Sequence, residues 1–459
     1  MTLIKSISGI RGTIGGVPGE GLTPLDIVKF ASAYGQWIRN RSSKKRYKIV
    51  IGRDARISGE MVERIISGTI SGMGIDIVSI GLATTPTVEI AVIKENADGG
   101  IIVTASHNPG QWNALKLLNE KGEFLSAMDG EQIISFTKND SYLYSAVNEI
   151  GKFSEISGYE DIHISDVLSL NLVNVELIKK AGFRVAIDCV NSVGGIIIPK
   201  LLKALGVKEV YELNCTPDGI FPHNPEPLPE NLTELSKLVR ENKADVGFAV
   251  DPDVDRLAII CEDGSMFGEE YTLVAVADYV LDKTPGNTAS NLSSSRALRD
   301  ITLLKNQKYF SSAVGEVNVI ETMKSNHCVI GGEGNGGIIY PAFHYGRDAL
   351  VGIGLFLTLL AEKKSKCSVL RRSYPEYVIS KNKIILDENK NFDEIIRKLK
   401  IEFKNENIDT RDGIKIDFQE GWVHLRKSNT EPILRVYAEA RDIESANRFA
   451  EKIIKIVQA

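Results

Sequence analysis

The stretch YKIVIGRDARISGEMVERIISGTISGMGIDIVSIG, residues 47–81, decides the fold class of the chain. Apolar β-branched runs near its two ends, Tyr47–Ile51 and Asp76–Ile80, predict strands, and Gly59–Gly72 between them has the apolar spacing of a helix. A strand, a helix and a second strand in such a short segment are typical of a sheet covered by helices. We therefore expect an α/β protein.

The same alternation recurs in three rounds, although no strict sequence period is visible. The further predicted elements of these rounds are the helix Pro86–Glu95, the strand Gly100–Val103, the strand Arg184–Ile187, a helix through Leu201–Leu205, the strand Glu209–Leu213, the helix Glu230–Asn242, the strand Val246–Val250, and a third round from Leu257 through Val329–Ile330. After about residue 368 several strands accompany two helices, which favours a small α+β domain. Its predicted strands are Tyr377–Ile385, Ile414–Phe418, Trp422–Leu425 and Ile433–Glu439, and its helices are Phe392–Ile401 and Glu444–Val457.

The length and composition fit a multidomain globular protein. The chain has 459 residues, 43% hydrophobic and 25% charged, and a chain of this length divides into about three domains, with two or four close behind. The changes of pattern divide it into four domains, residues 1–150, 151–255, 256–368 and 369–459.

Charge and cysteine usage exclude several classes of protein. The net charge of −5 argues against a general nucleic-acid binder, and five scattered cysteines without a CxxC pair predict a reducing compartment. The first residues lack the apolar segment of a signal peptide, and the apolar run Ala349–Ala361 is too short to span a bilayer. We expect a cytoplasmic protein without membrane contact, in which this run forms a buried helix.

The first segment whose side chains are suited to catalysis is TASHNP at 104–109, directly after the predicted strand Gly100–Val103. A turn at the carboxyl end of a strand is where α/β sheets bind ligands. The turn predicts an exposed Ser106 that acts as a nucleophile or phosphate carrier, with His107 beside it. A plain polar turn with a solvated histidine is the alternative, and the absence of GxSxG argues against a serine hydrolase.

The second segment is DPDVDR at 251–256, which follows the predicted strand Val246–Val250. Carboxylates at alternate positions, Asp251, Asp253 and Asp255, offer hard oxygen ligands to one divalent cation such as Mg²⁺. An EF-hand is rejected because its sixth loop position would be Arg256 rather than glycine and because a strand precedes the loop. A solvated acidic turn is the alternative.

Two later turns have the composition of substrate-binding segments. GGEGNGG at 331–337 lets the backbone approach a ligand, and its Glu333 and Asn335 suit vicinal sugar hydroxyls; a plain surface loop is the alternative. RKSNTEP at 426–432, followed by Arg435, combines arginine, lysine and hydroxyl groups as a phosphate site does, with a charged hairpin turn as the alternative.

Weaker signals come from isolated charges. SGIRG at 8–12 could place Arg11 near an anion, GRDAR at 52–56 ends a strand in a similar way, and Lys116 is a candidate proton carrier with a lowered pKa. Any of these residues taken alone is more often a surface charge. The histidines other than His107 show no HxxH spacing, so a zinc site is not expected.

Taken together, these segments resemble the α-D-phosphohexomutase family, in particular its phosphoglucosamine-mutase-like branch within the phosphoglucomutase/phosphomannomutase superfamily. The matching motifs, in order, are SGIRG at 8–12, GRDAR at 52–56, TASHNP at 104–109, NALK at 113–116, PDGIFPH at 217–223, PENL at 229–232, DPDVDR at 251–256, GEGNGG at 332–337 and RKSNTEP at 426–432. The resemblance implies three α/β domains with mixed sheets and a C-terminal α+β domain around a central cleft.

The resemblance also implies the site and the reaction. Ser106 would carry a phosphoryl group, and Mg²⁺ would bind a phosphoserine oxygen together with Asp251, Asp253 and Asp255. The remaining implied roles are contact with the phosphoserine for Arg256, assistance at the transferring phosphoryl group for Arg11, Lys116 and His107, sugar binding for Glu333 and Asn335, and binding of the other phosphate for Arg426, Ser428, Asn429, Thr430 and Arg435.

The substrate expected from the resemblance is glucosamine 6-phosphate, converted to glucosamine 1-phosphate through a hexose bisphosphate by a monomer or homodimer. Bacterial members commonly have serine and histidine where this chain has Asn335 and Gly337, and glycine in place of Asn429. PDGIFPH and PENL look more like members that act on glucose or mannose phosphates, which remain alternatives. A sugar-phosphate sensor and a phosphatase or bisphosphate synthase on the same scaffold are further alternatives.

Overall fold

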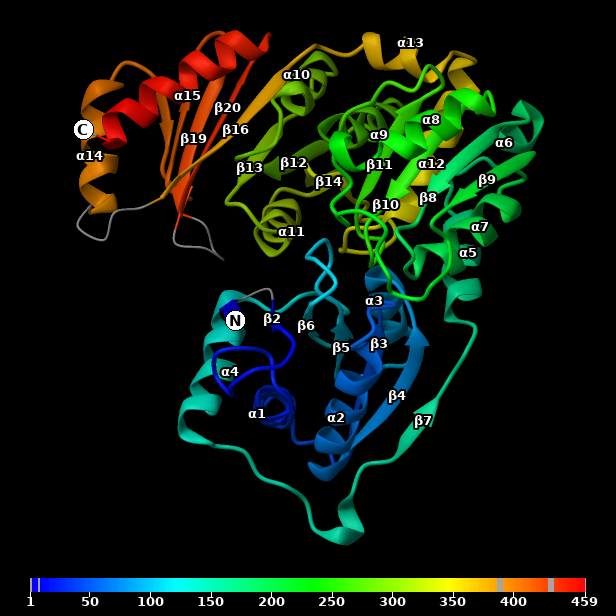
Figure 1. Cartoon of the computed structure of the whole chain (residues 1–459), viewed down its shortest axis with the longest axis vertical. Helices are drawn as coiled ribbons and strands as arrows, with labels where there is room; N and C mark the ends of the chain where they lie inside the picture. The colour runs from blue at the N-terminus through cyan, green and yellow to red at the C-terminus, as the bar shows by residue number, and fades with distance from the viewer. Residues whose placement is uncertain (1, 7–8, 386–390, 428–432, 459) are drawn as a thin grey trace. The chain divides into compact units, whose positions relative to one another are not determined.

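The computed structural model describes residues 2–6, 9–385, 391–427 and 433–458 (Figure 1). The chain divides into two compact units, Met1–Thr272 with Gly336–Leu370 and Leu273–Asn335 with Arg371–Ala459. The four sheets of the described residues confirm the α/β class with mixed sheets and a sheet-rich C-terminal domain. The predicted domain boundaries and the central cleft stay predictions.

The first unit begins with a seven-stranded mixed sheet of order β1-β2-β6-β5-β3-β4-β7. Its strands are β1 (Leu3–Ser6), β2 (Gly9–Thr13), β3 (Tyr47–Arg53), β4 (Ile75–Leu82), β5 (Gly99–Val103), β6 (Trp112–Leu118) and β7 (Phe153–Glu155). β3 is parallel to β4 and β5, as the opening stretch predicts, whereas β6 runs antiparallel to β5 and β2. The hairpin that places Arg11 on β2 was missed by the sequence patterns, because its strands are short and polar.

Helices cover both faces of this sheet, because side chains along β3 point alternately to one face and the other and both sets are buried. Ile49 and Ile51 face a core built with α1, α2 and α4, whereas Gly52 lies against Val88 of α3 on the opposite face. The helices are α1 (Pro24–Asn40), α2 (Gly59–Gly72), α3 (Thr85–Lys94) and α4 (Ala127–Asn139). α1 and α4 lie side by side (Figure 1), and each begins with a capping box, at Thr23 and Ser126 respectively.

The second sheet of this unit has the order β11-β10-β8-β9. Its strands are β8 (Arg184–Asp188), β9 (Glu209–Leu213), β10 (Val246–Val250) and β11 (Leu257–Cys261). β8 is parallel to β9 and β10, but β10 and β11 are antiparallel, so residues 251–256 form the turn between two buried strands.

Helices and short segments complete the first unit. They are η1 (Val147–Glu149), α5 (Tyr159–Leu168), α6 (Val175–Ala181), α7 (Gly194–Ala204), η2 (Pro229–Asn231), α8 (Thr233–Glu241), the short strand β15 (Gly337–Ile339) and α12 (Ala349–Lys363). The apolar run Ala349–Ala361 is buried throughout within α12, as predicted, and its Phe356 packs edge-on against Phe248 and Phe267.

The second unit contains two sheets. β12 (Asn287–Asn291) lies between β13 (Tyr309–Ser312) and β14 (Cys328–Glu333) and is parallel to both. The C-terminal sheet has the order β16-β20-β19-β18-β17, with β16 (Val378–Ile385), β17 (Asn407–Asp409), β18 (Ile414–Asp417), β19 (Trp422–Lys427) and β20 (Ile433–Ala440). It is antiparallel throughout its described pairs.

The helices of the second unit are α10 (Ala297–Leu304), α11 (Glu316–Ser325), α14 (Phe392–Glu402) and α15 (Ile443–Gln458). α14 and α15 bury Leu399 and Ile453 against the same face of the C-terminal sheet (Figure 1). Two further helices, α9 (Glu269–Lys283) and α13 (Cys367–Arg372), contain residues of both units.

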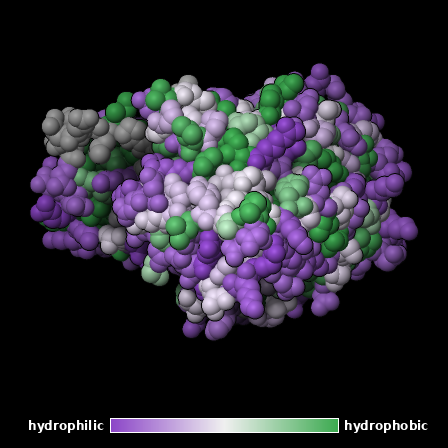
Figure 2. Space-filling model, turned by 90° about the horizontal axis from the view of Figure 1, so that it is seen from below, coloured by the Kyte–Doolittle hydropathy of each residue, from purple (hydrophilic) through white to green (hydrophobic). Residues whose placement is uncertain are grey.

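Figure 2 shows one face of the molecule, coloured by hydropathy. Hydrophilic residues predominate on the face shown in Figure 2, with hydrophobic residues scattered among them. Among the described residues, no helix combines the length and the apolar character needed to span a membrane.

Candidate active site

The Ser106 turn follows the carboxyl end of β5 and joins it to the antiparallel neighbour β6, inside the first sheet. Ser106 adopts φ = 49°, in the left-handed region that side chains other than glycine seldom occupy. Its backbone N–H donates to Thr104 Oγ1 at 2.9 Å, and its Oγ lies 3.3 Å from Nδ1 of His107. The turn therefore fixes the direction in which the Ser106 hydroxyl points.

Arg56 holds this strained turn in place. Its Nη2 donates to Asn108 O at 2.6 Å and to Ser106 O at 2.5 Å, and its Nη1 donates to Pro109 O at 2.7 Å. Its Nε donates to Asp54 Oδ2 at 3.0 Å, and both side chains of this ion pair are fully buried. The expectation that charges in this segment are surface charges is therefore wrong for Arg56.

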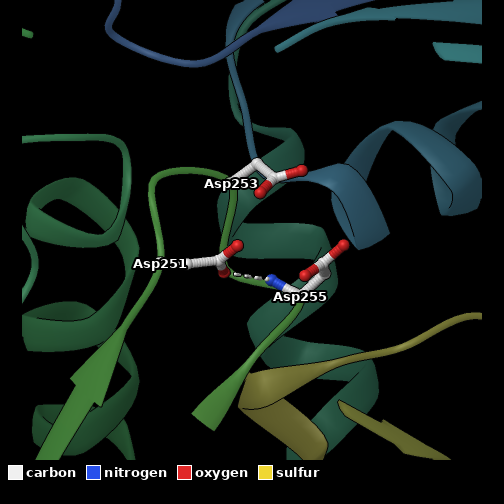
Figure 3. Close-up of side chains that lie close together, drawn as sticks. All are labelled: Asp251, Asp253 and Asp255. Carbon is white, nitrogen blue, oxygen red and sulfur yellow. Dashed lines mark hydrogen bonds between the residues drawn. The ribbon is translucent and has the colours of Figure 1, made fainter. Parts of the chain in front are cut away.

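The acidic turn lies next to the Ser106 turn within the first unit. Ser106 Oγ donates to Asp251 Oδ2 at 2.7 Å, although the two residues are 145 positions apart in sequence. Asp251, Asp253 and Asp255 are completely buried, and one oxygen of each lies within 4.8 Å of the others. Figure 3 shows their carboxylates directed at a common space.

Asp251 is held by the backbone of its own turn. Its Oδ1 accepts hydrogen bonds from the N–H groups of Asp255, at 3.2 Å, and of Arg256, at 3.1 Å. The first of these is the dashed line in Figure 3. Burial and the charges of Asp255 and Asp253 raise the pKa of Asp251 well above its ordinary range. A bound cation would remove this repulsion.

Asp253 and Asp255 each have one oxygen that is held and one that is not. Asp253 Oδ2 accepts from Thr85 Oγ1 at 2.5 Å and from Lys116 Nζ at 2.6 Å, and Asp255 Oδ2 accepts from Arg347 Nη2 at 2.6 Å. Their Oδ1 atoms are buried and make no hydrogen bond to any described residue. Unsatisfied buried carboxylate oxygens, all hard donors, fit a divalent cation of the Mg²⁺ type.

Lys116 projects from β6 toward the acidic turn. Burial alone would lower its pKa, but the charges of Asp253 and Asp255 outweigh burial, and the pKa of Lys116 is raised. The predicted lowering is therefore wrong, because the sequence does not show that two carboxylates, 137 and 139 positions away, contact the ammonium group. Lys116 is a fixed cation in this structure.

Other cations surround the same carboxylates. Arg256 is buried, its Nε lies 3.9 Å from Asp255 Oδ1, and this Nε makes no hydrogen bond to a described residue. Burial and the charge of Arg256 lower the pKa of Arg11 on β2. Burial and the charges of Arg256 and Arg11 also lower the pKa of His107 well below its ordinary value. The predicted residues Ser106, His107 and Lys116 therefore share one charged environment with these arginines.

The structure adds a buried network that the sequence patterns missed. Asp348 Oδ2 accepts from His163 Nε2 at 2.9 Å and from His344 Nε2 at 3.1 Å, and His344 Nδ1 lies 3.3 Å from Glu89 Oε2. Burial opposes protonation of His344, but its hydrogen bonds to Asp348 and Glu89 raise its pKa to about 10. His344 and Asp348 are only four residues apart, but His163 lies 185 positions from Asp348, and a pattern in one segment does not show such a contact.

The predicted sugar-binding residues lie in the second unit. Glu333 ends β14 and is buried, whereas Asn335 in the following turn is half-buried. Glu333 Oε1 accepts from Asn291 Nδ2 at 2.9 Å and from the N–H of Gly315 at 3.3 Å. Asn291, which sequence reasoning did not single out, therefore helps to fix the Glu333 carboxylate.

Arg426 and Arg435 of the predicted phosphate site are also in the second unit, opposite each other on β19 and β20. Arg426 is buried, its Nη1 donates to Lys427 O at 3.4 Å, and its Nε makes no hydrogen bond to a described residue. Burial lowers the pKa of Arg426, opposed by the charge of Asp412 and assisted by that of Arg435. Guanidinium groups are donors of the kind that bind phosphate, and the phosphate site stays a prediction. Ser428, Asn429 and Thr430 lie outside the described residues.

Comparison with known families covers nearly the whole chain. Four family models match in order, namely phosphoglucomutase/phosphomannomutase alpha/beta/alpha domain I at residues 3–143, domain II at 161–264, domain III at 268–377 and the C-terminal domain at 383–456.

Individual relatives agree with this assignment. A phosphoglucomutase/phosphomannomutase of Thermococcus kodakarensis is 36% identical over 97% of this chain and 98% of the relative, and a probable phosphoglucosamine mutase of Methanopyrus kandleri is 31% identical over 98% and 97%. A family member of Burkholderia thailandensis with a solved structure has a TM-score of 0.85 at 24% identity, over 99% of this chain and 97% of that one. The chain therefore belongs to the phosphoglucomutase/phosphomannomutase family and is a phosphohexomutase, an isomerase that transfers a phosphoryl group within its sugar substrate.

Proposed function

We propose that this phosphohexomutase interconverts glucosamine 6-phosphate and glucosamine 1-phosphate through a phosphoserine at Ser106 and a hexose bisphosphate. The observation that carries the phosphoserine is the 2.7 Å hydrogen bond from Ser106 Oγ to Asp251, which places a hydroxyl beside three buried carboxylates. A serine in a strained turn next to a cation site is positioned to accept and return a phosphoryl group.

We assign Mg²⁺ to the carboxylates of Asp251, Asp253 and Asp255, with one phosphoserine oxygen as a further ligand. Asp253 and Asp255 each have one oxygen anchored by protein donors and one buried oxygen without a hydrogen bond to a described residue. Asp251 is anchored through Oδ1 by backbone N–H groups, and its Oδ2 accepts from Ser106 Oγ. The ion, when bound, neutralises charge that develops on the phosphoryl oxygens. Arg256, Arg11 and Lys116 supply the remaining positive charge from fixed positions around the turn, which is the main protein contribution to phosphoryl transfer.

The proposed reaction is balanced across two transfers. In the first, a hydroxyl oxygen of the sugar phosphate bonds to phosphorus as the bond from phosphorus to Ser106 Oγ breaks, and His107 passes the hydroxyl proton to Ser106 Oγ, which becomes a hydroxyl. The resulting hexose bisphosphate turns end over end, and Ser106 Oγ then takes its other phosphoryl group while the proton returns to the released sugar oxygen. His107 is the group placed for this exchange, since its Nδ1 lies 3.3 Å from Ser106 Oγ.

We assign substrate binding to the second unit. Glu333 and Asn335 hold sugar hydroxyls, and Arg426 and Arg435, with Ser428, Asn429 and Thr430, hold the phosphate that is not reacting. The anchoring of one Glu333 oxygen by Asn291 supports a fixed acceptor for hydroxyls. The unsatisfied Nε of buried Arg426 supports an anion as its partner. The glucosamine assignment rests on the run SGIRG, GEGNGG and RKSNTEP and on the name of the Methanopyrus relative.

Glucose or mannose phosphates are the second candidate substrates. The motifs PDGIFPH and PENL favour them, as does the name of the Thermococcus relative at 36% identity.

The deciding experiment measures kcat/KM in parallel on the 6-phosphates of glucosamine, N-acetylglucosamine, glucose and mannose, together with release of inorganic phosphate. We expect the highest value for glucosamine 6-phosphate and little free phosphate. A preference for glucose or mannose 6-phosphate would replace the glucosamine assignment with the second candidate. Stoichiometric phosphate release would indicate a phosphatase instead.

A further inference from the structure

We propose that Arg347 is a positioning residue for the metal site, because it holds Asp255 in the orientation in which one carboxylate oxygen faces the cation. This inference rests on the proposed metal site, but it concerns a residue outside the acidic turn. Arg347 lies in the segment between β15 and α12, 92 positions after Asp255 in the sequence. Residues that orient metal ligands in this way are often distant from them in sequence.

The contact between the two side chains is short and buried. Arg347 Nη2 donates to Asp255 Oδ2 at 2.6 Å, where the arginine side chain is 9% exposed and the aspartate fully buried. Asp255 Oδ1 makes no hydrogen bond to a described residue. A guanidinium on one oxygen limits rotation of the carboxylate and leaves the other oxygen for a ligand.

The neighbouring carboxylate shows the same division of its two oxygens. Thr85 and Lys116 anchor Oδ2 of Asp253, whereas its Oδ1 has no hydrogen-bond partner among the described residues. Arg347 therefore anchors one oxygen of Asp255, as Thr85 anchors one oxygen of Asp253. Groups that orient metal ligands in this way contribute strongly to metal affinity without touching the metal.

The segment that carries Arg347 is itself fixed against the acidic turn. The N–H of Ala349 donates to Val254 O at 3.3 Å, and the N–H of Asp348 donates to Ile338 O at 2.9 Å. Asp348 also caps α12 through its Oδ1, which accepts from the N–H of Leu350 at 2.8 Å. The backbone at Arg347 is thus attached to the turn that Arg347 organises.

The buried network described above fixes this segment from the other side. Asp348 Oδ2 accepts from His163 and His344, and His344 faces Glu89 on α3. The backbone next to Arg347 lies close to Glu89, because a Cβ on Gly346 would lie 1.9 Å from Glu89 Oε2 and would force that side chain to move. Arg347 therefore has little freedom to move away from Asp255.

The test measures the affinity of the full-length chain for Mn²⁺, as a spectroscopic substitute for Mg²⁺, by electron paramagnetic resonance. Ser106 phosphorylation is equalised across the variants and verified by intact mass. We expect Arg347→Met to weaken Mn²⁺ binding roughly 10- to 100-fold with an unchanged thermal midpoint, since outer contacts of metal ligands have effects of this size. Arg347→Lys keeps the charge and most of the packing, and its affinity for Mn²⁺ should lie between those of Arg347→Met and the parent chain. This variant also provides the test if the methionine variant does not fold.

The matched control is Arg46→Met, which removes an arginine that pairs with Asp76 at 3.0 Å on the exposed surface of the same unit. It should bind Mn²⁺ like the parent chain. An affinity within twofold of the parent in both Arg347 variants would overturn the positioning role. Asp255→Asn separates the two proposals: if it also binds Mn²⁺ normally, the proposed metal site fails, whereas loss of binding only in Asp255→Asn overturns the inference about Arg347 alone.

Discussion

Two buried arginines, Arg56 in the first unit and Arg426 in the second, differ in the partners of their guanidinium groups. Arg56 donates to backbone oxygens of the Ser106 turn and to Asp54, all within the protein. Among the described residues, Arg426 has a long contact to Lys427 O, an Nε without a hydrogen bond and a second arginine opposite it. The first arginine holds a turn together, whereas we propose that the second binds a ligand phosphate.

This difference indicates how the two units divide the proposed reaction. In the proposed phosphoryl-transfer site, protein donors fix every carboxylate and the strained serine before any substrate binds, which is the preorganisation that electrostatic catalysis needs. In the predicted phosphate site, the counter-charge is supplied by the substrate. The predictions below test this contrast.

The largest effect is expected from Ser106→Ala, which removes the proposed phosphoryl carrier. Turnover should fall by roughly 10⁴-fold or more, as it does when a covalent nucleophile is deleted, while the thermal midpoint changes little. A coupled assay of hexose phosphate isomerisation measures it. Ser169→Ala, at an exposed serine after α5, is the control and should retain full activity. Normal turnover in Ser106→Ala would exclude the phosphoserine mechanism.

Removal of the divalent cation should have the next largest effect. Treatment with EDTA should lower kcat by about 10²- to 10³-fold, because the three carboxylates then lack their counter-charge, and Mg²⁺ should restore it. The same titration on Asp253→Asn should show little restoration. Full activity in excess chelator would contradict the proposal that the reaction requires a divalent cation.

Arg56→Met should act on stability rather than on substrate binding. It leaves Asp54 buried without its cation and removes the donors that hold the Ser106 turn, so the free energy of unfolding should fall by about 3–5 kcal/mol. Urea unfolding of the full chain measures this loss. A change below about 1 kcal/mol would show that the turn does not depend on this arginine.

Arg426→Ala should act in the opposite sense. Removal of a charged donor to the phosphate should lower kcat/KM by roughly 10- to 100-fold, mainly through KM, with little loss of stability. Steady-state kinetics on the preferred hexose phosphate measure it. If this variant instead lost stability as Arg56→Met does, the contrast between the two arginines would disappear.

The smallest effect is expected from Asn335→Ser, which introduces the residue common in bacterial phosphoglucosamine mutases. Because an amide contact is exchanged for a hydroxyl contact, the ratio of kcat/KM between glucosamine and glucose 6-phosphate should change by about 2- to 10-fold. An unchanged ratio would show that Asn335 does not read the sugar.

The fold class and the cluster of three aspartates could be predicted from the sequence because their signals are local. The alternation around residues 47–81 predicted the α/β class, and the alternate carboxylates of Asp251, Asp253 and Asp255 lie together as a trio. The run Ala349–Ala361 is a buried helix, as its length and hydrophobicity indicated.

The groups that support the site could not be predicted, because their partners are distant in sequence. Arg56 contacts the backbone oxygen of Asn108, which lies 52 positions later in the sequence. Arg347 contacts Asp255 across 92 positions. The raised pKa of Lys116 has the same origin, since it depends on carboxylates of another sheet. Local patterns give the type of a side chain, but its burial and its partner follow from the fold.

The central claim, that Ser106 lends its phosphoryl group to the sugar, is tested most directly by a single-turnover transfer experiment. Chain labelled with radioactive phosphate at Ser106 is mixed with excess unlabelled glucosamine 6-phosphate and quenched at successive times. The account predicts that label leaves Ser106, passes through a hexose bisphosphate and accumulates in hexose monophosphate. Label that stays on the protein while product forms, or that is released as inorganic phosphate, would contradict it.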